Sequence, residues 1–305
     1  MTRLYPVINV GHGFLLAGAL LLSMAATAFG STAYAAPTDK VSDQAPANSG
    51  EQLSPSGEPE AKTPPYVKKA APEGGYRIVV LGDSLGVGAW QGLYQNFKGS
   101  EDPNFEVIQE ARVNTGIVRS DRFNWPKQVR TLARKGGFEI AVLMFGGNDM
   151  QSIRLKGKRH HYQTEGWVEH YTKRIDDMVL ALKSEDVAVY WMGLPIVKRD
   201  KLREDYEYIN QLARERMEHH GVRYVDTWTV SADDNGTYSQ FGRDEDGRKV
   251  KLRARDGVHF TPEGYRRFAA PVEAQIRADV AARNGEYEAA DSSSEDDKPP
   301  KDNRG

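Results

Sequence analysis

Three short segments of the chain carry side chains that together suit acyl-transfer chemistry. They are Gly82-Asp83-Ser84-Leu85, Gly146-Gly147-Asn148-Asp149 and Asp256-Gly257-Val258-His259. A serine can act as a nucleophile, a histidine as its base, and a nearby carboxylate can orient that histidine. An asparagine amide can donate a hydrogen bond to the oxyanion that forms on the attacked carbonyl group. The set therefore predicts nucleophilic attack on an ester or a related acyl group.

Ser84 and Asn148 each follow an apolar run that is typical of a buried strand. The first run is Ile78–Leu81 and the second is Ile140–Phe145. We expect Ser84 to begin a helix, where backbone N–H groups face an oxyanion. Each segment taken alone also fits an ordinary polar turn after a strand. The order of all three segments favours the chemical interpretation.

Asp256 and His259 lie three residues apart in a segment that precedes a predicted helix. The carboxylate can accept a hydrogen bond from imidazole Nδ1 and leave Nε2 facing the serine, which fixes the tautomer. The alternative for this pair in isolation is a surface histidine beside an acid. Asp149 is expected to have a structural role, because a triad acid must lie next to the base.

Between residues 76 and 283, short apolar runs alternate with longer amphipathic segments. Strands that alternate with helices predict an α/β fold with a parallel sheet covered by helices on both faces. Ligands bind beyond the carboxyl ends of such strands. The expected strands are Arg77–Gly82, Phe105–Glu110, Glu139–Phe145, Val187–Gly193 and Val222–Asp226. The expected helices are about Gly86–Asn96, Pro126–Lys135, Trp167–Ser184, Lys201–His220 and Pro262–Ala282, the last with Thr261 as N-cap.

The three segments resemble sequence blocks of the SGNH, or GDSL-type, hydrolase superfamily, over roughly Tyr76–Ala282. Within that superfamily the chain is similar to an exported bacterial branch catalogued as a domain of unknown function. The glycine block of the superfamily is placed at Asn114-Thr115-Gly116. The resemblance implies a three-layer, flavodoxin-like α/β/α fold with about five parallel strands. It also implies serine esterase or acyltransferase chemistry with no metal and no cofactor.

The resemblance also assigns roles to individual residues. It implies that Ser84 is the nucleophile, His259 the base and Asp256 the group that orients the base. It further implies an oxyanion hole made by the Ser84 N–H, the Gly116 N–H and the Asn148 amide.

Several neighbouring residues are candidate substrate contacts. They are Asp83, Asp149, Arg119 and Trp125. A Trp face beside hydrogen-bonding side chains suits a sugar ring, although packing of Trp125 at the start of the next helix is the alternative. The basic run Arg154–Arg159 is expected near the pocket mouth, where it either steers an anionic ligand or is simply solvated. Residues 232–255 are expected to form a flap or hairpin.

The ends of the chain differ in composition from its centre. Residues 1–35 resemble a signal peptide, with Arg3 before an apolar stretch at residues 13–30 and Ala33-Tyr34-Ala35 as a cleavage site. An uncleaved membrane anchor at residues 13–30 is the alternative. Residues 36–75 are expected to form a disordered linker, residues 76–283 a single folded domain and residues 284–305 a disordered charged tail.

Overall composition narrows the classes of function. The chain of 305 residues has a formal net charge of −2, which does not favour binding to nucleic acid, and it has no cysteine. The chemical segments, the resemblance and the signal-peptide pattern together lead us to expect an exported, periplasmic or secreted, esterase or O-acyltransferase. Its expected partner is a small ester, chiefly O-acetyl groups on cell-envelope carbohydrate. The alternatives are a lipolytic esterase or thioesterase, and a non-catalytic glycan-binding module with the same fold.

Overall fold

A five-stranded parallel sheet is the centre of the computed structural model, which describes residues 64–99, 104–244 and 246–295. The strands lie in the order β2-β1-β3-β6-β7. Strands β3 and β6 are buried along their whole length, as expected for a sheet covered on both faces. The strands are β1 (Tyr76–Gly82), β2 (Phe105–Gln109), β3 (Ile140–Met144), β6 (Ala188–Met192) and β7 (Arg223–Val225). The predicted α/β fold with a five-stranded parallel sheet is confirmed.

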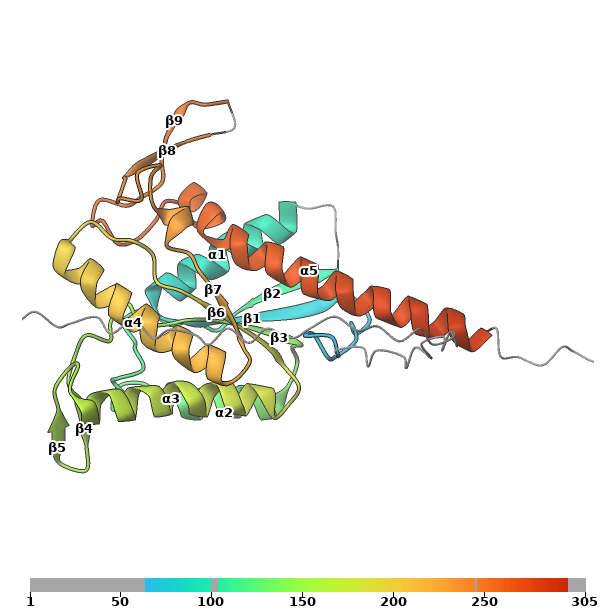
Figure 1. Ribbon diagram of the computed structural model, residues 1–305, viewed down its shortest axis with the longest axis horizontal. Helices are drawn as coiled ribbons and strands as arrows, with labels where there is room; N and C mark the ends of the chain where they lie inside the picture. Colours follow the sequence, from blue (N-terminus) through green and yellow to red (C-terminus); the bar gives the residue numbers. More distant parts are fainter. Residues whose placement is uncertain (1–63, 100–103, 245, 296–305) are drawn as a thin grey trace, which may run out of the picture. The chain divides into compact units, whose positions relative to one another are not determined.

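Helices cover both faces of this sheet (Figure 1). Helices α1 (Ser84–Gly99) and α5 (Pro262–Glu295) pack together on one face. The opposite face is covered by α2 (Trp125–Lys135), α3 (Glu165–Lys183) and α4 (Asp200–His219). The three layers place the beginnings of these helices at the carboxyl end of the sheet.

Glycines on α1 allow α5 to approach it closely. A Cβ atom added at Gly88 would lie 1.9 Å from the Tyr265 ring, and one added at Gly92 would lie 2.1 Å from the Tyr265 carbonyl oxygen. Thr261 caps α5, as predicted, because its Oγ1 accepts a hydrogen bond of 3.1 Å from Gly264 N–H. This packing brings the start of α1, at Ser84, beside the loop that precedes α5.

Two antiparallel hairpins project from the central layers. Strands β8 (Phe241–Arg243) and β9 (Lys249–Lys251) form the hairpin expected within residues 232–255, and it lies at the top of Figure 1. Strands β4 (Ile153–Leu155) and β5 (Lys158–His160) form the other, where the sequence suggested only a basic loop. Its turn residues, Lys156 and Gly157, have φ angles of 48° and 80°, as a two-residue type I′ turn requires.

The folded region extends beyond both predicted boundaries. Val67 is fully buried, and Tyr66 donates a hydrogen bond to the Val189 carbonyl and accepts one of 3.0 Å from Arg223 N–H. Tyr66 and Val67 therefore anchor this part of the predicted linker to the sheet, because an aromatic and an apolar side chain lie within a polar segment. At the other end, α5 continues to Glu295, past the predicted boundary at residue 283.

The predicted signal peptide, the possible anchor at residues 13–30 and most of the predicted linker lie outside the described residues. In the part of the chain that the structure describes, no helix combines the length and the apolarity needed to cross a membrane.

Candidate active site

Ser84 lies at the switch point of the sheet, where the chain turns to opposite sides of β1. Strands β1 and β3 are neighbours with Gly82 paired to Met144, so both strands end at the same level. The crevice beyond such a switch point is the usual ligand site of doubly wound sheets. Ser84 begins α1 directly after β1, and its first backbone N–H groups have no acceptor within the helix.

Asp83 joins the loops that follow β1 and β3. Its carboxylate is fully buried, with Oδ1 accepting a hydrogen bond of 2.9 Å from Leu85 N–H. Oδ2 accepts a second bond of 2.9 Å from Gly147 N–H. These bonds tie together the loops that carry Ser84 and Asn148. The structure therefore corrects the expectation that Asp83 contacts substrate, because both of its oxygens are committed inside the protein.

Ser84, His259 and Asp256 form a continuous hydrogen-bonded relay. His259 Nε2 lies 2.9 Å from Ser84 Oγ, and His259 Nδ1 lies 2.7 Å from Asp256 Oδ2. Burial acts to raise the pKa of Asp256, but hydrogen bonds from the His259 side chain and from Val258 and His259 N–H lower it to about 2. An ionised carboxylate only accepts, so Nδ1 carries the proton and Nε2 accepts from the serine hydroxyl. The geometry is that of a nucleophile, a base and an orienting acid.

Hydrogen bonds from Arg253 and Lys198 hold the loop that carries His259, and neither residue was identified from the sequence. Arg253 is buried, and its Nη2 donates to the carbonyls of Val258 at 3.0 Å and Ile196 at 2.8 Å. Burial lowers the pKa of Arg253 to about 10, so the guanidinium stays charged at neutral pH. Gly257, with φ of 72°, accepts a bond of 3.0 Å from Lys198 N–H. Nothing local distinguishes Arg253 from the exposed basic residues around it.

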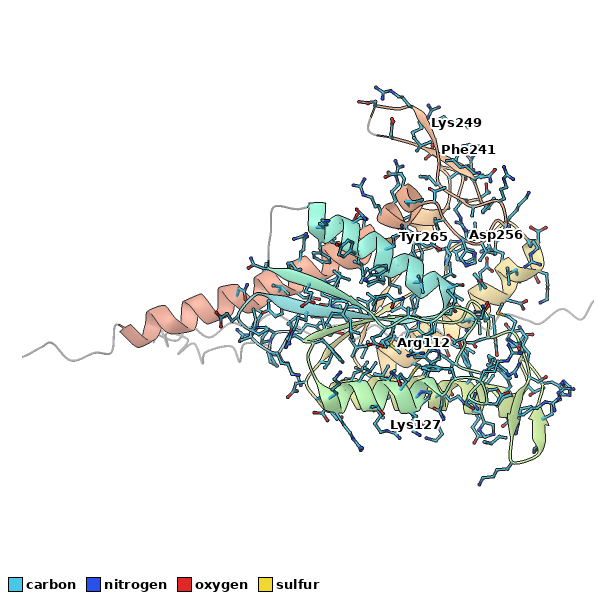
Figure 2. The ribbon with its side chains drawn as sticks, turned by 180° about the vertical axis from the view of Figure 1, so that it is seen from behind. Arg112, Lys127, Phe241, Lys249, Asp256 and Tyr265 are labelled. Atoms are coloured by element: carbon cyan, nitrogen blue, oxygen red, sulfur yellow. The ribbon has the colours of Figure 1, made fainter. Side chains whose placement is uncertain are left out.

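The wider setting of this loop is visible in Figure 2. Asp256 and Tyr265 lie on the same side of the sheet as the β8–β9 hairpin, which carries Phe241 and Lys249. Lys249 Nζ lies 4.4 Å from the centre of the Phe241 ring, so the hairpin presents an aromatic and a cationic group together. Asp256 remains half exposed, with 50% of its side chain accessible.

Asn148 and Gly116 lie together, as an oxyanion hole requires. Asn148 Nδ2 donates a hydrogen bond of 2.8 Å to the Thr115 carbonyl. An amide NH₂ group has two N–H donors, so the second remains for a ligand. A Cβ atom added at Gly116 would lie only 2.3 Å from Asp149 Oδ1 and 3.6 Å from Asn148 Cβ. Only glycine fits this close approach without a shift of the buried carboxylate.

Asp149 supports the loop that contains Gly116. Its buried carboxylate accepts hydrogen bonds from Val118 N–H at 3.1 Å and from the Tyr171 hydroxyl at 3.2 Å. These bonds agree with the structural role expected for Asp149 and correct the alternative expectation that it contacts substrate. The carboxylate oxygens of Asp83 and Asp149 thus accept hydrogen bonds from groups of the protein itself. Within the described ranges, no group of three or more His, Asp or Glu side chains has an arrangement that could hold a metal ion.

Two further candidate contacts have different surroundings from those expected. Trp125 is fully buried, and its Nε1 donates a bond of 3.1 Å to Thr115 Oγ1. It therefore supports the Gly116 loop from inside and packs at the start of α2, which confirms the packing alternative and corrects the expected contact with a sugar. Arg119 is bound to Asp121 by two hydrogen bonds of 2.8 and 2.6 Å, and its side chain remains 32% exposed.

The two buried carboxylic acids predict an unusual dependence of stability on pH. Burial raises the pKa of Asp83 to about 7 and that of Asp149 to about 6, both above the ordinary value of 3.8. At pH values between the ordinary pKa of 3.8 and these raised pKa values, the folded state binds more protons than the unfolded state. The free energy of unfolding therefore falls as pH rises from 4 to 7. Each acid contributes a slope of at most about 1.4 kcal/mol per pH unit. Urea unfolding at several pH values measures this slope.

The variant Asp149→Asn is expected to have a shallower slope, because it removes one of the two titrations. Asp121→Asn is the matched control, since the hydrogen bond from Arg119 lowers the pKa of Asp121 to about 2, outside this range. Equal slopes for wild type and Asp149→Asn between pH 4 and 7 would contradict the raised pKa of Asp149.

The three-layer fold and the Ser–His–Asp geometry together define the class: an α/β/α protein with a hydrogen-bonded serine, histidine and aspartate at the carboxyl end of its parallel sheet. The chain belongs to the family described as "Protein of unknown function (DUF459)", whose model matches residues 77–275. The predicted placement in a branch catalogued as a domain of unknown function is confirmed. The matched residues run from β1 into α5 and so contain all three parts of the relay.

Comparison with solved structures finds remote similarities to proteins of this type. A GDSL-like lipase from Bacteroides thetaiotaomicron is 17% identical, with 70% of this chain and 94% of that chain covered and a TM-score of 0.46. A lipase/acylhydrolase from Enterococcus faecalis is 18% identical, with coverage of 67% and 96% and a TM-score of 0.47. A catalytic mutant of an acetylxylan esterase from Geobacillus stearothermophilus is 16% identical, with coverage of 66% and 94% and a TM-score of 0.48. No curated protein matches the chain.

Proposed function

We propose that the protein is an exported serine esterase or O-acyltransferase that acts on small O-acyl groups, chiefly O-acetyl groups, of cell-envelope carbohydrate. The observation that carries the proposal is the relay of 2.9 Å from Ser84 Oγ to His259 Nε2 and 2.7 Å from His259 Nδ1 to Asp256 Oδ2. Export is supported by the N-terminal sequence, with its basic start, apolar stretch and small residues at a cleavage site.

The proposed reaction begins with Ser84 Oγ attacking the ester carbonyl carbon while His259 Nε2 takes the hydroxyl proton. The negative charge that develops on the carbonyl oxygen is stabilised by hydrogen bonds from the Asn148 amide and from the N–H groups of Ser84 and Gly116. The intermediate then collapses, the bond to the leaving oxygen breaks, and His259 returns its proton to that oxygen. Water or a second sugar hydroxyl, deprotonated by His259, releases the acyl group from Ser84.

The solvent exposure of the Ser84–His259–Asp256 relay favours a substrate in which a small acyl group is attached to a large carrier. The side chains of His259 and Asp256 are 36% and 50% exposed, so the reacting bond is approached from the protein surface. A polymer can reach such a site without threading into the protein. An extended acyl chain would instead need a long apolar channel to bury it, since most of its binding energy comes from removal of apolar area from water.

Asn148→Ala is expected to lower kcat by about 10²- to 10³-fold with a smaller effect on KM, because the amide acts on charge that develops only in the transition state. The loss of its bond to the Thr115 carbonyl also frees the neighbouring loop, so thermal unfolding is measured alongside. Asn96→Ala is the control, since its Nδ2 likewise donates to a backbone carbonyl, that of Arg266 at 2.9 Å, but it has no role in the proposed oxyanion hole. A kcat of Asn148→Ala equal to that of the control argues against the oxyanion role.

The proposal is tested by intact-protein mass measurement after brief exposure to p-nitrophenyl acetate. One acetyl adduct per chain, located at Ser84 by peptide mapping, is the expected result. A folded protein that forms no adduct at Ser84 with this reagent or with a fluorophosphonate would overturn the proposed nucleophile.

A further inference from the structure

A basic cavity of about 310 Å³ lies beside the proposed oxyanion hole. Three arginines line it, Arg119, Arg154 and Arg159, against a single acid, Asp121. Arg119 is occupied by Asp121 through two hydrogen bonds. The cavity therefore has an excess of positive charge that Asp121 does not neutralise.

Arg154 and Arg159 are direct cross-strand partners in the β4–β5 hairpin. Side chains directly opposite in an antiparallel pair have Cβ atoms about 4.5–5.5 Å apart, and like charges there are destabilising. Neither arginine has a carboxylate partner among the residues that the structure describes. The hairpin thus holds two unpaired guanidinium groups side by side at the cavity, an arrangement that an anion between them stabilises.

The cavity is joined to the catalytic loops on two sides. Gln151, which lines it, donates a hydrogen bond of 2.6 Å to the carbonyl of Asn148. Val118, which also lines it, donates from its N–H to Asp149 and is two residues beyond Gly116. In Figure 1 the β4–β5 hairpin lies at the left, the same end of the sheet at which α1 begins. A ligand in the cavity is therefore next to the residues that face the reacting carbonyl group.

We propose that Arg154 and Arg159 form a subsite for an anionic substituent, a carboxylate or a phosphate group, carried by the acylated carbohydrate. This inference rests on the proposed esterase or transferase function and names the charge class of its substrate. The planar guanidinium matches either group through two parallel N–H···O bonds. Binding of this remote group orients the substrate and holds its acyl ester at Ser84.

The test compares kcat/KM for acetylated substrates that differ in charge. The anionic probes are acetylated oligogalacturonate, which carries carboxylates, and acetylated glucose 6-phosphate. The neutral probes are acetylated xylooligosaccharide and p-nitrophenyl acetate. Wild type is expected to favour an anionic probe over acetylated xylooligosaccharide, the neutral probe with the same kind of leaving group, and the better of the two anionic probes identifies the anion. Added NaCl is expected to reduce this preference, because salt screens exposed charges.

The variant Arg154→Gln/Arg159→Gln is expected to lose at least about 10-fold in kcat/KM on the preferred anionic probe, through two charge-assisted hydrogen-bonded contacts. Its rate on p-nitrophenyl acetate is expected to equal that of wild type. The matched control is Lys156→Gln/Lys158→Gln, which removes the same charge from the same hairpin outside the cavity lining. This control is expected to lose less than about 3-fold, because its lysines act only through a screened field.

The outcomes separate the two proposals. Hydrolysis of no probe by wild type contradicts the proposed function itself. Hydrolysis of all probes with no preference for charge, or an equal loss in both double variants, overturns the subsite and leaves the esterase proposal standing. An equal loss on the neutral and anionic probes in Arg154→Gln/Arg159→Gln also overturns the subsite, since the arginines then act only on the structure.

Discussion

Replacing Ser84 with alanine is expected to reduce the hydrolysis of p-nitrophenyl acetate by at least about 10⁴-fold. The loss is this large because the substitution removes the atom that forms the covalent bond, and His259 alone has no nucleophile at the same position. The fold is expected to persist, since the Ser84 hydroxyl contacts His259 at the surface of the site and Asp83 still ties the two loops together. Steady-state rates corrected for the uncatalysed reaction measure the effect.

The control for this prediction is Ser184→Ala, which removes a serine hydroxyl that bonds the Ala181 carbonyl at the end of α3. It is expected to leave the rate unchanged. A Ser84→Ala protein that is folded by circular dichroism and retains more than a few per cent of the wild-type rate would show that another group is the nucleophile.

The variant Asp256→Asn is expected to lower kcat by up to about 10⁴-fold, and His259→Ala by at least as much. An asparagine amide in place of the carboxylate favours the imidazole tautomer with its proton on Nε2, where it cannot accept the proton of Ser84. The carboxylate is also lost as the group that stabilises the imidazolium ion. The pKa of Asp256 is lowered to about 2, so the wild-type carboxylate is ionised across the whole pH range of a rate profile from 4 to 9.

Asparagine is a suitable replacement because it retains an oxygen that can accept the loop hydrogen bonds. Asp256 Oδ1 accepts from Val258 N–H at 2.9 Å and from His259 N–H at 3.0 Å, and these bonds shape the turn. The free energy of unfolding of Asp256→Asn is therefore expected to remain close to that of wild type. A large loss of stability together with a small loss of kcat would place Asp256 in the structure of the loop and not in the reaction.

The sequence predicted the parts of the site that depend on local spacing. Asp256 and His259 are three residues apart, and a tight loop brings their side chains into contact. Ser84 and Asn148 follow apolar runs that form strands, so a parallel sheet places both residues at its carboxyl end. The central strands were predicted within one or two residues of their ends, because they are buried on both faces and read as continuous apolar runs.

Burial of individual polar and aromatic residues was only partly predictable. A structural role for Asp149 and packing of Trp125 were among the expectations, yet both residues were also candidate substrate contacts, as was Asp83. The structure turns all three inward to support the loops. Their environments depend on contacts between distant segments, such as the bond from Gly147 N–H to Asp83, which spans 64 positions. Arg253 was missed for the same reason, since a charged residue in a charged segment gives no sign of being buried.

The packing of α1 against α5 has a consequence for when the chain acquires its activity. Ser84 and His259 are 175 positions apart in the sequence. They come into contact because the glycines of α1 allow α5 to pack closely against it. A contact between such distant positions requires closure of a long stretch of chain, which slows folding. The proposed nucleophile has no base until α5 has docked, so the onset of the proposed esterase activity during refolding would report the docking of α5.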